Sequence, residues 1–124
     1  MPDSAVRWVC LSTTAPALSV LRDWLALHVH ESLDDGDGLL GMAQLVLTEL
    51  VTNAYQHASG PYEVILRCLP DRVRIEVADR STALPHGHHY GLRLVEALAL
   101  RWGVAARPAG KIVWAELLVT VPSV

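Results

Sequence analysis

The sequence predicts an α+β domain of two layers, with three helices on one face of a mostly antiparallel mixed sheet. The order of segments favours this fold class, because strand-like and helix-like patterns alternate as strand, helix, helix, hairpin, loop, helix and hairpin. Composition favours a packed core, since 52% of the residues are hydrophobic and 19% are charged. A chain of 124 residues is long enough to bury one core. We therefore expect residues 1–124 to form a single domain.

The first strand and the first helix are predicted before residue 34. The apolar run Val6 to Leu11 reads as a strand. The segment Thr13 to Pro16 then offers a hydroxyl cap and a proline for the first turn of a helix. This helix is expected to end near Leu33, and its large side chains recur along one side at Leu18, Leu21, Trp24, Leu25 and His28.

The second predicted helix follows a loop at residues 34–38 and ends at Ser59 and Gly60, glycine being a common exit residue. Glu49 and Asn53 fall on its polar face, lie one turn apart and point the same way. A carboxylate and an amide held in this way suit a Mg²⁺ ion and an attacking hydroxyl. The alternative is the solvated face of an ordinary amphipathic helix. The apolar face consists of Val46, Leu47, Leu50, Val51 and Ala54.

A hairpin is predicted next, with strands Tyr62 to Leu69 and Arg72 to Asp79 joined by a tight turn at Pro70 and Asp71. Asp79 shares the alternation of Val73, Ile75 and Val77, so a regular strand turns its carboxylate toward the core. Such a carboxylate needs hydrogen-bond partners from the protein or from a ligand. The alternative is an aspartate that caps the following turn.

The last third of the chain contains a loop at residues 80–89, a third helix and a final hairpin. The helix is predicted from Tyr90 to a stop at Arg101-Trp102-Gly103, and the strands are predicted at Val104–Arg107 and Lys111–Val121. A glycine at the start of a helix, here Gly91, lets phosphate approach free backbone amides, although it can equally be a simple turn residue. The loop contains His86, His88 and His89, which could form a zinc site or simply lie on the surface. No cysteine or carboxylate stands beside them at ligand spacing.

Charge and targeting patterns narrow the class of protein. The formal net charge of -3 gives no electrostatic reason to expect nucleic acid. Cys10 and Cys68 lack metal-ligand spacing and are expected to be small buried side chains. The N-terminal residues lack the pattern of a signal peptide, and no apolar run approaches the ~20 residues that span a bilayer. We expect a cytoplasmic protein without a membrane segment.

Three motifs in this order resemble the GHKL ATPase superfamily, whose members share the Bergerat fold. Glu49 to His57 resembles its N box, Val77 to Ser81 its first glycine box, and Tyr90 to Val95 its second. Within the superfamily the chain most resembles short anti-sigma factor serine kinases of actinobacteria. The runs that carry this closer resemblance are Gly91–Ala99, Arg101–Val104 and Trp114–Leu117.

The resemblance implies ATP and Mg²⁺ as cofactors and a role for each motif residue. Asn53 would bind the Mg²⁺ that bridges the phosphates, and Glu49 would be the general base on a serine hydroxyl. Asp79 would accept a hydrogen bond from the adenine amino group, and the backbone at Gly91 and Leu92 would meet phosphate. The implied partners are a sigma factor and an anti-anti-sigma protein of the STAS type, and self-association as a homodimer is possible.

Two positions depart from the motifs. Ser81 stands where the first glycine box has glycine, and His89 stands where the second has its first glycine. Both add side chains beside the expected nucleotide. They keep open an alternative function, a non-catalytic interaction module of the same fold that sequesters a regulatory partner without nucleotide.

Overall fold

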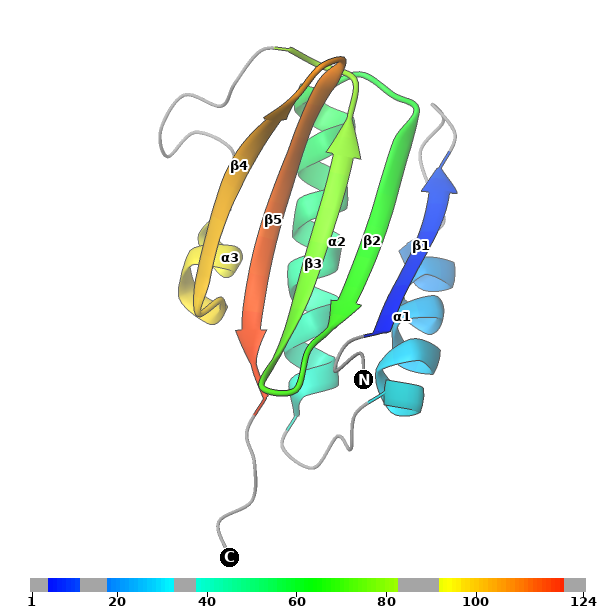
Figure 1. The fold of residues 1–124 in the computed structure, drawn as a ribbon, viewed down its shortest axis with the longest axis vertical. Helices are drawn as coiled ribbons and strands as arrows, with labels where there is room; N and C mark the ends of the chain where they lie inside the picture. Colours follow the sequence, from blue (N-terminus) through cyan, green and yellow to red (C-terminus); the bar gives the residue numbers. More distant parts are fainter. Residues whose placement is uncertain (1–4, 12–17, 33–37, 83–91, 120–124) are drawn as a thin grey trace, which may run out of the picture.

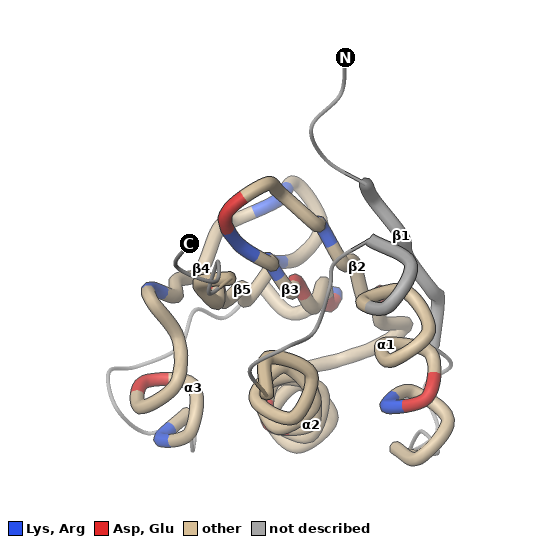
Figure 2. The backbone as a smooth tube through the Cα atoms, turned by 90° about the horizontal axis from the view of Figure 1, so that it is seen from below, with Lys and Arg blue, Asp and Glu red and all other residues tan. Residues whose placement is uncertain are grey.

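The computed structural model describes residues 5–11, 18–32, 38–82 and 92–119 as two layers, a sheet and a layer of helices (Figure 1). Seen end-on, the helices lie together on one side of the sheet (Figure 2). In chain order the elements are β1 (Ala5–Leu11), α1 (Leu18–Ser32), α2 (Leu39–His57), β2 (Tyr62–Cys68), β3 (Arg72–Asp79), α3 (Arg93–Leu98), β4 (Arg101–Arg107) and β5 (Gly110–Leu118). The predicted α+β class and its helix-on-sheet layers are therefore confirmed.

The sheet has the strand order β1-β2-β3-β5-β4, and the four pairings between the described strands are antiparallel. The expectation of a mixed sheet was wrong for these strands. β4 runs parallel to β3, because both strands pair antiparallel with β5, which lies between them. The two parallel strands are therefore never neighbours.

The third helix is shorter than predicted. It ends at Leu98, and the residues expected to close it, Arg101 to Gly103, form the start of β4 instead. The amide of Leu100 donates to the carbonyl of Glu116 at 2.7 Å, and Trp102 pairs with Ala115 in the ladder. Pairing with β5 thus takes these residues out of the helix.

Helix α2 lies against the middle of the sheet and supplies much of the core (Figure 1). Leu47, Leu50 and Val51 are each at most 1% exposed. Full burial of such side chains contributes about 1.5–3 kcal/mol each. Asn53, expected on the polar face of this helix, is also buried, at 6% exposure. The alternative of a merely solvated polar face is therefore wrong at this residue.

Candidate functional site

A cavity of about 300 Å³ lies along α2 where this helix meets the start of α3. Six of its seven lining residues belong to α2 and recur at the spacing of one helical face, so α2 forms its floor, while Leu94 approaches from α3. None of the described residues that line it is lysine or arginine. The lining residues are Leu45, Thr48, Glu49, Thr52, Asn53, Gln56 and Leu94.

Glu49 caps helix α3 across the cavity. Its Oε2 accepts the amide of Leu94 at 3.2 Å, and its Oε1 accepts the amide of Val95 at 2.9 Å. Leu92, the residue at the N-cap position, has no side-chain cap and is buried at 5% exposure. A helix begins with unpaired N–H groups and a partial positive charge. A carboxylate accepts hydrogen bonds from these groups and interacts favourably with that charge. Glu49 therefore supplies the side-chain cap of α3 that Leu92 cannot supply.

Asn53 lines the same cavity and has a buried side-chain oxygen without a partner. Its side chain is 6% exposed, and its Oδ1 has no hydrogen-bond partner among the described residues. A buried polar atom left in this state costs about 1–3 kcal/mol. An amide oxygen one turn from a carboxylate suits Mg²⁺, which prefers oxygen ligands. The residues present therefore fit the implied metal.

Asp79 lies elsewhere, at the end of β3, and borders a second cavity of about 220 Å³. As predicted it is buried, with 3% exposure, and its partners come from the protein. The Nζ of Lys111 lies 3.0 Å from its Oδ2 and 3.1 Å from its Oδ1, and Lys111 is also 3% exposed. The amide of Ser81 donates to Oδ1 at 2.8 Å, so the aspartate caps the following turn as well. Both of its oxygens are engaged.

The start of β5 comes very close to Asp79. A Cβ at Gly110, whose φ is +152°, would lie 1.9 Å from the carbonyl oxygen of Asp79. Only glycine fits this approach and this backbone conformation. Lys111 follows directly and pairs with Asp79 in the ladder, which puts its side chain on the same face.

Two tyrosines lie near this ion pair. The rings of Tyr55 and Tyr62 have centroids 4.1 Å apart, and the Tyr62 hydroxyl donates to the carbonyl of Ala58 at 3.2 Å. Burial raises the pKa of Tyr62, and the charge of Asp79 raises it further. Burial and Tyr62 raise the pKa of Tyr55 in the same way. The neutral tyrosines are thus favoured beside Asp79.

The structure brings together some of the predicted site residues and separates others. Glu49 and Asn53 share one cavity, while Asp79 borders the other. Leu92 lies beside the amides that Glu49 caps. Gly91 and the histidine loop lie outside the described residues, so phosphate contact at Gly91 and zinc binding stay predictions. Sequence reasoning missed Lys111, for which the one available signal was that it is the only lysine.

Comparison with known proteins adds no family to these observations. A scan against protein-family models found no match, and neither did a search of curated proteins. Within the described ranges no three His, Cys, Asp or Glu side chains gather as a metal site would require. No helix in these ranges has the length and apolar character needed to cross a membrane.

Proposed function

We propose that this chain is a Mg²⁺- and ATP-binding domain of the Bergerat type that acts as an anti-sigma factor and protein-serine kinase. Its proposed partners are a sigma factor and an anti-anti-sigma protein of the STAS type, whose serine it phosphorylates in the cytoplasm. The observation that carries the proposal is the cavity shared by Glu49 and Asn53, with its buried and unpartnered amide oxygen.

Each residue of this pair has a separate task. The Oδ1 of Asn53 would hold the metal, and bound Mg²⁺ would neutralise charge on the phosphates. Glu49 accepts the proton of the partner's serine hydroxyl as that oxygen bonds to the γ-phosphorus and ADP leaves. Each carboxylate oxygen has a second lone pair beyond the one used for an amide of α3. Glu49 can therefore stay bound to α3 while it takes the proton.

Asp79 limits the proposal. Asp79 is 3% exposed and its Oδ1 already accepts from Lys111 and from the Ser81 amide, so an adenine amino group would have only the second lone pair of Oδ2. This pair favours the second candidate function, an interaction module that binds its partner without nucleotide. In that module Glu49 serves α3 alone and the Asp79–Lys111 pair is purely structural.

Titration calorimetry with ATP, ADP and GTP, each with and without Mg²⁺, tests the proposal. We expect Mg²⁺-dependent binding of ATP and ADP that Asn53→Ala weakens ~10- to 150-fold, the worth of one contact to a charged group. Gln56→Ala, in the same cavity but exposed, is the matched control and should bind as the wild type does. Absence of binding to any nucleotide would select the interaction module. Equal affinity for ATP and GTP would contradict only the role of Asp79 in base recognition and would leave the rest of the proposal standing.

A further inference from the structure

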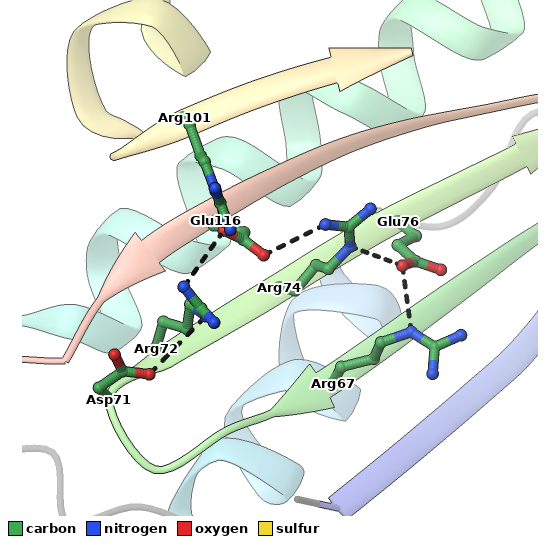
Figure 3. Close-up of polar contacts among 7 residues, drawn as sticks. All are labelled: Arg67, Asp71, Arg72, Arg74, Glu76, Arg101 and Glu116. Atoms are coloured by element: carbon green, nitrogen blue, oxygen red, sulfur yellow. Dashed lines mark hydrogen bonds and ion pairs between the residues drawn. The ribbon is translucent and has the colours of Figure 1, made fainter. Parts of the chain in front are cut away.

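The described helices leave one face of the sheet uncovered (Figure 2), and charged side chains lie in a row across that face (Figure 3). Arg67 of β2 pairs with Arg74 of β3, Arg74 pairs with Glu116 of β5, and Glu116 pairs with Arg101 of β4. These four residues therefore lie side by side across four strands. We call them the arginine row.

Ion pairs join the row to Glu76, which lies two residues along β3. The Nε of Arg74 donates to Glu76 at 2.7 Å, and its Nη1 donates to Glu116 at 3.1 Å. Arg67 donates to the same Glu76 oxygen at 3.0 Å, and Arg101 donates to Glu116. Glu76 and Glu116 are 5% and 2% exposed although no described helix covers them. Arginine side chains thus form the outer surface here.

Trp114 fixes the position of the central arginine. The guanidinium carbon of Arg74 lies 4.0 Å from the centre of the Trp114 ring, which is a cation–π contact. A Cβ at Gly103, the cross-strand neighbour, would lie 2.8 Å from that ring, so glycine gives the indole its place. Two carboxylates and one aromatic ring therefore hold Arg74 in place.

The arginines at the two ends of the row retain binding capacity. Arg67 and Arg101 use only Nε in the contacts described, and their side chains are 43% and 57% exposed. Figure 3 shows the terminal nitrogens of Arg67 pointing away from Glu76. A guanidinium whose terminal nitrogens are accessible can bind a carboxylate in bidentate fashion. The row thus offers two carboxylate-binding groups separated by three strand spacings, or about 14 Å.

Charge in this region is positive but modest. Including Arg72, which lies 3.9 Å from Glu116, four guanidinium groups surround two carboxylates. Asp71 lies 3.7 Å from Arg72 and brings the surplus from two positive charges to one. A dense line of phosphates would meet these three carboxylates, which disfavours nucleic acid. A second copy of the chain would bring its own arginines against the row, and the like charges disfavour that partner.

We propose that the arginine row binds an acidic segment of a partner protein. Two carboxylates on that segment, about four residues apart if it is extended, contact Arg67 and Arg101. The site lies on the face of the sheet opposite α2, so it is separate from the cavity of Glu49 and Asn53 and independent of nucleotide.

An NMR titration of the ¹⁵N-labelled chain tests this site. The probe is a soluble, otherwise neutral peptide with aspartates at two positions four residues apart, compared with the same peptide carrying asparagines. We expect the aspartate peptide to shift amide signals of β2 and β4, with an affinity that falls as salt is raised. The asparagine peptide should leave these signals unmoved. Equal shifts from both peptides, or none from either, would overturn the proposal.

Charge-removing variants locate the contact. Arg67→Gln and Arg101→Gln should each weaken binding about 2- to 5-fold, as expected for exposed ion pairs, and together by their product. Arg22→Gln removes an exposed charge from α1 on the other side of the sheet and should have no effect. Preserved signal dispersion shows that each variant is folded. If a single-stranded oligonucleotide binds more tightly than the aspartate peptide, the arginine row is a nucleic-acid site instead. If the wild type self-associates and the double variant does not, the row binds a second copy of the chain instead.

Discussion

Replacing Lys111 with methionine should destabilise the fold more than any exposed substitution. The change removes the ammonium group but leaves Asp79 charged, 3% exposed and without its strongest partner. Breaking a buried pair by removing one member typically costs about 3–5 kcal/mol. Methionine has a similar volume and no charge, so the loss reflects the ion pair and not a cavity. At roughly 4 °C per kcal/mol for a domain of this size, the melting temperature should fall by ~12–20 °C.

Urea unfolding of a small set of variants measures this cost. Asp79→Asn keeps an oxygen for the Ser81 amide, so combining it with Lys111→Met removes both charges while that hydrogen bond survives. We expect the double variant to recover most of the stability that either single variant loses. Arg93→Met, an exposed cation on α3, is the control and should change stability by less than ~0.5 kcal/mol. A loss below ~1 kcal/mol in Lys111→Met, or a double variant as unstable as the sum of the singles, would refute the reasoning.

Three further predictions concern the other carboxylates and the cavity. Glu49→Gln should lower the free energy of unfolding by about 0.5–2 kcal/mol, because the glutamine oxygen accepts only one of the two α3 amides. The same variant should bind ATP as the wild type does but transfer phosphate ~10²–10⁴-fold more slowly. Undiminished transfer would leave Glu49 a cap alone. Asn53→Ala should weaken nucleotide binding yet change urea stability little, because the gain from removing a buried oxygen without a partner offsets the packing that truncation loses. A large loss of stability would show that Oδ1 is bonded in the fold. Burial alone would raise the pKa of Glu116, but hydrogen bonds from Arg101 and Arg74 and the charges of Arg101 and Arg72 lower this pKa below its ordinary value of 4.5. A lowered folded-state pKa stabilises the fold above the unfolded pKa, and that contribution is lost as the pH falls through the folded value. Stability should therefore decline below about pH 4.5, and less steeply in Glu116→Gln.

Local patterns in the sequence predicted local features of the structure well. The alternation of β3 correctly placed Asp79 toward the helices, and the spacing of α2 correctly selected Leu47, Leu50 and Val51 for the core. Glycine and proline correctly marked the boundaries near Gly60 and Pro70. These features depend on the geometry of a single helix or strand, which neighbouring residues determine.

The features that the sequence did not predict all join distant segments. Glu49 caps amides that lie 45 and 46 residues further along, and Lys111 meets Asp79 across 32 residues. Neither contact produces a periodic pattern. The buried state of Asn53 also arises from packing and not from its place on the helix. Glu49 and Asn53 line one cavity, and the sequence could predict that they lie together because both residues belong to α2.

The place of β5 in the sheet has a consequence for how the protein folds during synthesis. β5 is the last of the described strands to leave the ribosome, yet it lies between β3 and β4. Until it emerges, β3 presents an unpaired edge, and such edges readily pair with other chains. The nascent domain also lacks Lys111 and Glu116, so Asp79 and the arginines of β3 have no counter-charges from β5. Folding should therefore be completed in one late step that depends on contacts of long sequence separation.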